Sequence, residues 1–266
     1  MKLLYERGSH ALSELTDIDN LFAELKKTKK SKARPLVDKL EKKLSKIFGT
    51  TVIVELQNHG EFVDNFAVLP ILYSDKQKTK DNVLTPNSIK LNKIELLYLM
   101  IGMDLVKDSK PRQITGILLH EVGHVTQHVS MMSNYLTQFL QQFQYISDIM
   151  SRVPVINFVF SPLFIITTRS LNFRNHAFEY GADKFAIQYG YGDDLAEWCF
   201  EHLKQKRKVP FNLSGAAYML KTLFEGSSHP SFKKRIYAVI KEMKTNYSKE
   251  YGDKRLKQLL DKYYNT

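Results

Sequence analysis

Cysteine is nearly absent from this chain of 266 residues, since Cys199 is the only one. An internal disulfide is therefore excluded, and so is a metal site built from a cluster of cysteines. The first ten residues contain no apolar targeting segment, because Tyr5, Glu6 and Arg7 interrupt the short apolar start. We therefore expect no secretory signal and a cytoplasmic location, which suits a chain with a single thiol.

The chain also has little continuous hydrophobic sequence. Its most apolar stretch runs from Val153 to Ile166 and is interrupted by Asn157 and Pro162. A helix that crosses a bilayer needs roughly twenty apolar residues, and this stretch is shorter. We expect a buried or lid-like segment, with a membrane-dipping segment and a true span as the alternatives.

Several signatures of other enzyme classes are missing as well. The chain has no Gly-x-Ser-x-Gly elbow, no phosphate-binding loop and no cysteine pair. The sequence GYGDD at 190–194 has the composition of a helix end and does not match a dinucleotide fingerprint. There is neither an internal repeat nor a low-complexity tract.

Positive charge is in excess, with 39 basic and 28 acidic residues and a formal net charge of +11. Such a balance favours acidic partners, for example an anionic membrane surface or a nucleic acid. The lysines are spread out and interleaved with glutamates, so we expect a solvated surface, and nucleic acid is an unlikely partner. The run KKTKKSKAR before Pro35 is interpreted as a solvated linker, with contact to an anionic surface as the alternative.

The first fifty residues predict basic helices. Within LVDKLEKKLSKIFG, Leu36, Leu40, Leu44 and Ile47 share one helical face, and Gly49 is placed to end the helix. An earlier helix is expected around residues 18–25. We therefore divide the chain into a basic helical extension, 1–49, and a main domain, 50–266, with a lid-like apolar segment at 131–168.

After residue 49 the sequence changes from helical spacing of apolar residues to short segments typical of strands. The segments 50–56, 66–73 and 87–92 are rich in β-branched and aromatic residues, which predicts two or three short strands. A long helix is expected from about Pro111 to Ser130, with Ser109 as its N-cap. Further helices are predicted at 131–150, 177–189, 193–206, 213–224, 230–244 and from 249. The predicted fold class is α+β, mainly helical, with a small sheet beside the long helix.

The long helix carries the sequence LLHEVGH at 118–124. Residues four apart lie on the same helical face, so His120 and His124 can direct two imidazole nitrogens at one metal ion. Glu121 is offset by one position and can reach a water molecule bound to that ion, which is the arrangement of two ligands and a general base. The alternative is a pair of ordinary helix histidines.

A third ligand has to come from another part of the chain. His128 lies about 12 Å of helical rise beyond His120, which is too far for both to bind one ion. In HAFEYGADKFA, Glu179 and Asp183 are again four apart, so Glu179 can ligate while Asp183 accepts a hydrogen bond from a ligand histidine. A solvated acidic face is the alternative, and His176 is a weaker candidate ligand.

Gly123 and Gly181 lie inside these two motifs. Glycine in a helix interior costs about 1 kcal/mol relative to alanine. The two glycines therefore indicate that the two helices pack closely together.

Three motifs occur in a fixed order: HEVGH at 120–124, EYGAD at 179–183 and SSHPSFKKRI at 227–236. In this order they resemble the HtpX and CAAX-prenyl-protease family of zinc metallopeptidases, over about residues 52–239. The resemblance implies a zincin-like metalloprotease domain of gluzincin type, with Zn²⁺ as the cofactor. It implies that His120, His124 and Glu179 are the zinc ligands and that Glu121 is the catalytic base.

The resemblance also implies roles for residues around the ligands. By this resemblance, Asp183 is a carboxylate that supports the metal ligands without binding the ion. His229 and Arg235 belong to a segment that closes over the site. From its residue type, His229 can donate a hydrogen bond to a developing oxyanion, with a loop residue before a helix as the alternative. Arg235 is expected to pair with Asp183 or Glu179.

The sequence DNFAVLP resembles a shortened form of the strand that precedes the metal helix in this family. We expect Asn65, Phe66 and Ala67 to bind the substrate as an added strand. The predicted function is therefore a zinc-dependent endopeptidase acting on protein or peptide substrates. The rival is a non-catalytic basic binding or assembly protein that keeps a structural metal site. The clear transmembrane helices of many relatives have no counterpart here.

Overall fold

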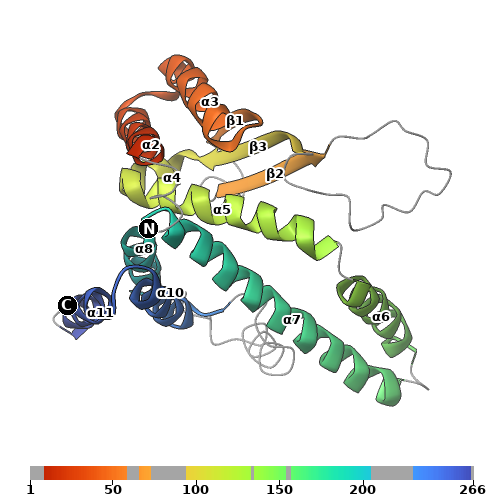
Figure 1. Cartoon of the computed structure of the whole chain (residues 1–266). Helices are drawn as coiled ribbons and strands as arrows, with labels where there is room; N and C mark the ends of the chain where they lie inside the picture. The colour runs from red at the N-terminus through yellow and green to blue at the C-terminus, as the bar shows by residue number, and fades with distance from the viewer. Residues whose placement is uncertain are drawn as a thin grey trace.

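The computed structural model describes residues 9–58, 66–72, 94–132, 135–153, 157–204 and 230–264. Their secondary structure is mainly helical with one small sheet, as the sequence predicts (Figure 1). The elements are α2 (Ser9–Lys27), a short 3-10 helix (Lys30–Lys32), α3 (Arg34–Phe48), β1 (Thr51–Gln57), β2 (Phe66–Leu72), β3 (Ile94–Gly102), α4 (Met103–Asp108), α5 (Pro111–Met132), α6 (Tyr135–Ser151), α7 (Asn157–Gln188), α8 (Gly192–Lys204), α10 (Phe232–Asn246) and α11 (Lys249–Tyr264).

The sheet has the strand order β1-β3-β2, with β1 parallel and β2 antiparallel to the central strand β3. Two strands were predicted within one residue of their ends. The third predicted strand, 87–92, lies outside the described residues, and the sequence analysis missed β3. Leu97, Leu99 and Ile101 are buried and the alternate side chains are partly exposed, but the sequence IELLYLMIG is apolar on both faces and shows no alternation.

The two N-terminal helices share one hydrophobic core with the sheet and α5. From α3, Leu40 and Leu44 are fully buried, and Gly49 ends the helix with φ 68° and an N–H bond to the Ser45 carbonyl, as predicted. From α2, Ile18 and Phe22 belong to the same cluster of buried side chains. The predicted boundary at residue 49 thus falls between elements that pack around a common core.

The predicted N-cap of α5 is wrong. The backbone N–H of Ser109 bonds to the Leu105 carbonyl and closes α4 instead. At the start of α5, the side chain of Gln113 accepts a hydrogen bond from the Lys110 N–H at 2.9 Å. Gln113 thus supplies the reciprocal half of a capping box three residues into the helix, so no hydroxyl is needed before Pro111.

Helix α7 is longer than predicted. The sequence analysis started this helix at residue 177, whereas the helix begins at Asn157 and continues through the apolar segment to Gln188. Polar side chains inside this segment bond to the helix itself: Thr167 donates to the Leu163 carbonyl and Ser170 to the Ile166 carbonyl. These bonds satisfy the hydroxyl groups within the helix.

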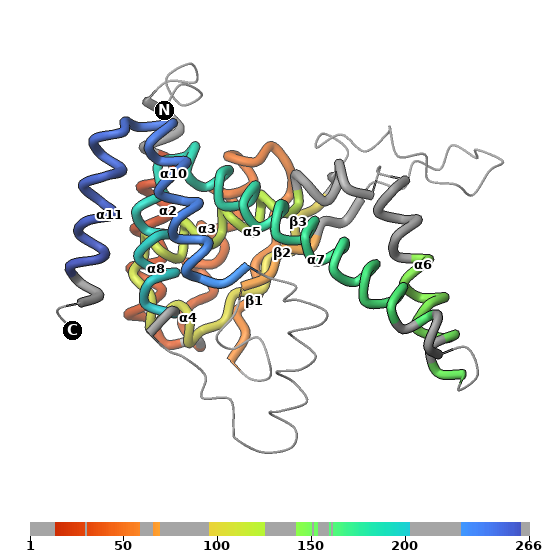
Figure 2. Tube along the Cα trace, turned by 90° about the horizontal axis from the view of Figure 1, so that it is seen from below, coloured from red at the N-terminus to blue at the C-terminus, as the bar shows by residue number. Residues whose placement is uncertain are grey.

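Helices α6 and α7 lie side by side and extend away from the sheet (Figures 1 and 2). The side chain of Gln144 on α6 donates to Thr168 on α7 at 2.8 Å. Of the two forms predicted for this segment, buried or lid-like, the buried one is wrong for Val153 and Ile166, which are exposed. Within the described part of the chain, no helix is both long and apolar enough to cross a bilayer.

Helices α8, α10 and α11 form the other end of the molecule, where α11 runs beside α10 (Figure 2). Their apolar faces make a second cluster that includes Val239, Met243 and Leu259. Cys199 is buried in this cluster, and burial raises the pKa of its thiol to about 12. The single cysteine is therefore an unreactive core residue.

Candidate metal centre

Three helices bring the candidate site residues together. Helix α5 lies between the sheet and α7 (Figure 1), and it carries His120, Glu121 and His124. Helix α7 carries Glu179 and Asp183, and α10 carries Arg235. All but two of these side chains are buried; Glu121 and His124 are partly open to solvent.

The two histidines face each other one helical turn apart. Their Nε2 atoms are 3.1 Å apart, and the ring planes are nearly perpendicular. In the absence of an ion, a hydrogen bond at this distance needs a proton on one of the two Nε2 atoms. The approach of the two nitrogens suits a shared cation, because a cation accepts both lone pairs.

Glu179 of α7 brings a carboxylate close to the two imidazoles. Its Oε2 lies 3.5 Å from Nε2 of His120, and its Oε1 lies 3.5 Å from Nε2 of His124. A tetrahedral ion with ligand distances of about 2.0–2.1 Å holds its ligand atoms about 3.3 Å apart. The two nitrogens and the Glu179 carboxylate therefore fit the donor set of such an ion.

Glu121 lies beside the same histidines. One candidate ligand atom from each of His120, Glu121 and His124 lies within 4.8 Å of the others. The Glu179 oxygens lie 3.5 Å from the imidazole nitrogens, so two carboxylates, Glu121 and Glu179, lie beside the histidines. Burial raises the pKa of the Glu121 carboxyl, and the nearby histidines offset part of this effect.

Asp183 fixes the tautomer of His120. Its Oδ1 lies 2.9 Å from Nδ1 of His120, closer than Nη2 of Arg235 at 3.3 Å, and an ionised carboxylate can only accept, so we assign the proton to Nδ1. The lone pair of His120 is then on Nε2, which faces His124 and Glu179. Burial would raise the pKa of Asp183, but Arg235 and His120 hold it below its ordinary value.

Arg235 joins the two carboxylates of α7. Its Nη2 and Nε donate to the two oxygens of Asp183 at 2.5 and 3.1 Å, and its Nη1 lies 3.4 Å from Glu179. Burial opposes the charged guanidinium, but Asp183 and Glu179 keep its pKa above the ordinary value. Its guanidinium also lies 5.9 Å from the ring of Trp198 on α8, a neighbour that the sequence analysis did not single out.

Gly123 is where α5 and α7 approach most closely. A Cβ atom on Gly123 would lie 2.9 Å from the Cα of Ala182 and 3.0 Å from the Cβ of Phe185. Contacts this short with a helix backbone cannot be relieved by a side-chain rotation. The prediction of close packing at Gly123 is therefore confirmed, and this contact places Glu179 next to the histidines.

Gly123→Ala is expected to lower the free energy of unfolding by about 1–3 kcal/mol, because the methyl group separates α5 from α7. Gly116→Ala, on the same helix, is the matched control. Its Cβ would meet only ordinary contacts, the nearest at 3.6 Å. Replacing a helical glycine there should raise stability by about 0.5–1 kcal/mol. Urea unfolding of both variants gives the comparison, and equal shifts of the same sign would contradict the packing argument.

The structure describes only some of the other predicted site residues. Asn65 and His229 lie outside the described residues. Phe66 and Ala67 lie in β2, paired with Ile101 and Met100 of β3. The Phe66 side chain is buried in the core, so a contact with substrate would have to come from its backbone. His176 is half-buried on α7, one turn before Glu179.

Comparison with protein families gives one match: the model of peptidase family M48 matches residues 93–243. The match covers more than half of the chain and contains every residue of the cluster described above. The chain belongs to peptidase family M48. None of the curated proteins and none of the solved structures compared with it matches.

Membership of family M48 makes the chain a metalloprotease, a hydrolase that acts on proteins or peptides. The mainly helical α+β structure agrees with the zincin-like fold predicted for it. The matched region starts at β3 and ends in α10. Helices α2, α3 and α11 and strands β1 and β2 lie outside the M48 match.

Proposed function

We propose that this M48 peptidase is a zinc-dependent endopeptidase with His120, His124 and Glu179 as the zinc ligands. The observation that carries the proposal is the convergence of two imidazole nitrogens and one carboxylate at separations of 3.1–3.5 Å. When bound, a zinc ion supplies polarisation of the scissile carbonyl and acidification of a water molecule. Within the family, the HEVGH, EYGAD and SSHPSFKKRI motifs favour the HtpX and CAAX-prenyl-protease type.

The residues around the proposed ligands have separate roles in the reaction. Glu121 takes the proton of the attacking water and passes it to the leaving amine nitrogen. Its raised pKa suits both the acceptance and the return of that proton. Asp183 holds His120 in the tautomer that directs Nε2 towards the ligand position, and Arg235 keeps Asp183 ionised.

We also propose that the substrate binds as an added strand along β2. In the described sheet β2 is an edge strand, bonded to β3 on one side. It also lies close to α5, the helix that carries the histidines. Backbone groups near Ala67 would fix the peptide, and we assign the metal chemistry to the 50–266 part of the chain with 1–49 as its basic extension.

The hairpin of α6 and α7 supports a preference for apolar substrates. Ile146 and Ile149 are exposed three residues apart on one face of α6, and Val153 is exposed just after its end. On α7, Ile166 and Phe173 are 59% and 76% exposed and share a face. Phe173 precedes Glu179 by about 9 Å of helical rise. An apolar segment bound along this surface would thus lie near the ligand cluster.

A double variant tests this role of the hairpin. Ile166→Gln with Phe173→Gln should raise the KM for an unfolded apolar protein about tenfold, because two apolar contacts are lost. Cleavage of a short peptide that ends near the metal site should be unchanged. Ile53→Gln with Leu260→Gln changes two other exposed apolar residues and serves as the control. A KM that is equal in both double variants would remove the hairpin from substrate binding.

The proposed activity is tested by digesting a peptide library and identifying the products by mass spectrometry. Wild-type protein should cleave internal peptide bonds, lose this activity with a chelator and regain it when zinc is added. Restoration by another divalent metal alone would overturn the zinc assignment. Release of terminal residues only would show an exopeptidase.

A further inference from the structure

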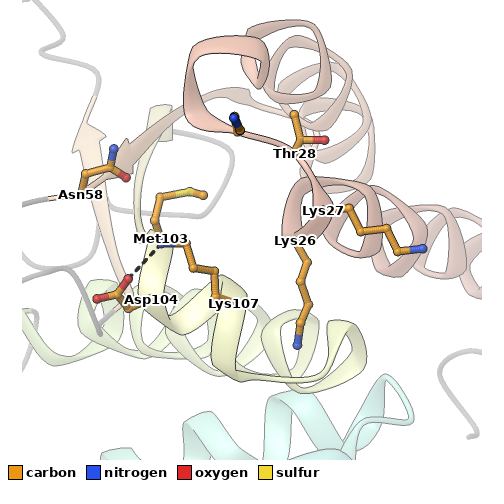
Figure 3. A pocket seen from close by; sticks show the side chains of 8 residues that line it. Lys26, Lys27, Thr28, Asn58, Met103, Asp104 and Lys107 are labelled. Atoms are coloured by element: carbon orange, nitrogen blue, oxygen red, sulfur yellow. Dashed lines mark hydrogen bonds and ion pairs between the residues drawn. The ribbon is translucent and has the colours of Figure 1, made fainter.

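A pocket of about 540 Å³ lies away from the metal cluster, between the end of α2, the end of β1 and the start of α4 (Figure 3). It shares no residue with the cluster of α5, α7 and α10. Four lysines line it: Lys26, Lys27, Lys29 and Lys107. The first three come from the basic run KKTKKSKAR, and the last comes from α4, about eighty residues further along the chain.

The pocket has a strong excess of positive charge. Its lining contains one acidic side chain, Asp104, so the formal charge is four minus one, or +3. Lys107 pairs with Asp104 at 3.3 Å, but both side chains are about half exposed, and such pairs contribute little. Lys27 and Lys29 have no acidic partner within the described residues.

Two lysines of α3 are arranged differently from those of the pocket. Lys43 pairs with Asp17, and Lys46 pairs with Glu14. Each of these ammonium groups is matched by a carboxylate of the neighbouring helix. The four lysines of the pocket are exposed to solvent and share one carboxylate, so this surface attracts anions.

The other lining groups suit a ligand that is more than a bare ion. Asn58 offers an amide donor at one side of the pocket, and Met103 is a buried apolar residue beside it (Figure 3). Lys26 donates to the Ser109 carbonyl at 2.9 Å, which fixes the side chain at the rim. A volume of this size lies within the range of small-molecule sites.

We propose that this pocket binds a phosphate-bearing ligand through Lys27, Lys29 and Lys107. Lysine is a common phosphate ligand because its ammonium group acts as a compact charge with three donors. Lys107 exchanges Asp104 for the phosphate, and Lys27, which extends away from Met103 and Asn58 in Figure 3, turns towards it. Lys26 borders the site. The phosphate belongs either to a small soluble compound or to the head group of a phospholipid, since both present the same chemistry.

The test compares two triple variants of the full chain. Lys27→Ala, Lys29→Ala and Lys107→Ala remove the pocket charge. Lys233→Ala, Lys254→Ala and Lys257→Ala remove three exposed lysines of α10 and α11 and serve as the control with the same net charge. Pyrophosphate binding is measured by calorimetry, and vesicle binding by co-sedimentation with phosphatidylcholine alone or with added phosphatidic acid.

The pocket variant should bind at least about tenfold more weakly than wild type, because three ammonium groups that contact the phosphate are removed. The control variant should bind like wild type. Binding of pyrophosphate would identify a soluble ligand, and binding only of vesicles with phosphatidic acid would identify a head group. Equal weakening in both variants, or no binding of either probe by wild type, would overturn the proposal.

A second measurement does not depend on the variants. Acylation of lysines in wild-type protein, read by mass spectrometry, should be slowed by the bound probe at Lys27, Lys29 and Lys107. Lys233 and Lys257 should react at an unchanged rate. Uniform protection would contradict a local site. Pyrophosphate captured by the metal centre would bind both triple variants equally, so this outcome separates the pocket from the peptidase site.

Discussion

Replacing Glu121 with glutamine is expected to abolish peptide cleavage while the protein keeps its metal. Glutamine has nearly the same shape but cannot accept the proton of the attacking water. Loss of a positioned general base should lower kcat by about a hundredfold to ten-thousandfold. Because the proposed ligands are His120, His124 and Glu179, zinc measured by mass spectrometry should remain at the wild-type level.

Glu24→Gln is the matched control, because Glu24 is an exposed glutamate of α2 outside the site. It should retain wild-type activity and metal content. Full activity in Glu121→Gln would remove Glu121 as the base. Loss of zinc in Glu121→Gln would instead show that Glu121 is a ligand, as its position within the His120 and His124 group also allows.

Arg235→Met is expected to have the largest effect on stability. The guanidinium is buried and bonds to Asp183 with two donors, while it also lies close to Glu179. Methionine fills similar space but leaves buried carboxylates without their positive partner. Breaking such a pair costs about 3–5 kcal/mol, which urea unfolding at constant slope can measure.

The comparison for this variant is an exposed pair of the same residue types. Arg152 bonds to Asp148 at 2.6 Å on the surface of α6, and Arg152→Met should change stability by only about 0.5 kcal/mol. Arg235→Lys should fall between the two, since it keeps the charge but loses the second donor. If Arg235→Met were as mild as Arg152→Met, the buried pairing would not stabilise the site.

The sequence alone places the residues on faces of helices, but not the helices relative to one another. The spacing of His120 and His124 follows from helix geometry, as does that of Glu179 and Asp183. Nothing in that spacing brings α7 next to α5. Gly123 was the local signal for the contact, and Ala182 opposite it could not be found because alanine is common in helices. The Trp198 contact with Arg235 depends on α8, whose position is set by tertiary packing.

The errors of the fold prediction have related causes. Strand β3 is apolar on both faces, so its sequence shows no alternation that separates a strand from a buried helix. Helix α7 continues through Pro162, which the sequence pattern indicated as an interruption. The hydroxyl groups of Thr167 and Ser170 bond to carbonyls of the same helix. Ser109 has the right residue type for an N-cap, but α4 uses it as its end.

The continuity of α7 has a mechanical consequence. The helix is held against α5 at Ala182, three residues from Glu179, while Ile166 lies sixteen residues away on the same side of that contact. The two lever arms are about 4.5 Å and about 24 Å, from the helical rise of 1.5 Å per residue. If α7 tilts as a rigid rod about this contact, a sideways movement of about 1 Å at Ile166 reaches Glu179 as about 0.2 Å. If substrates bind at this surface as proposed, the apolar end would adapt to their shapes while the distance from Glu179 to the two imidazoles changes little.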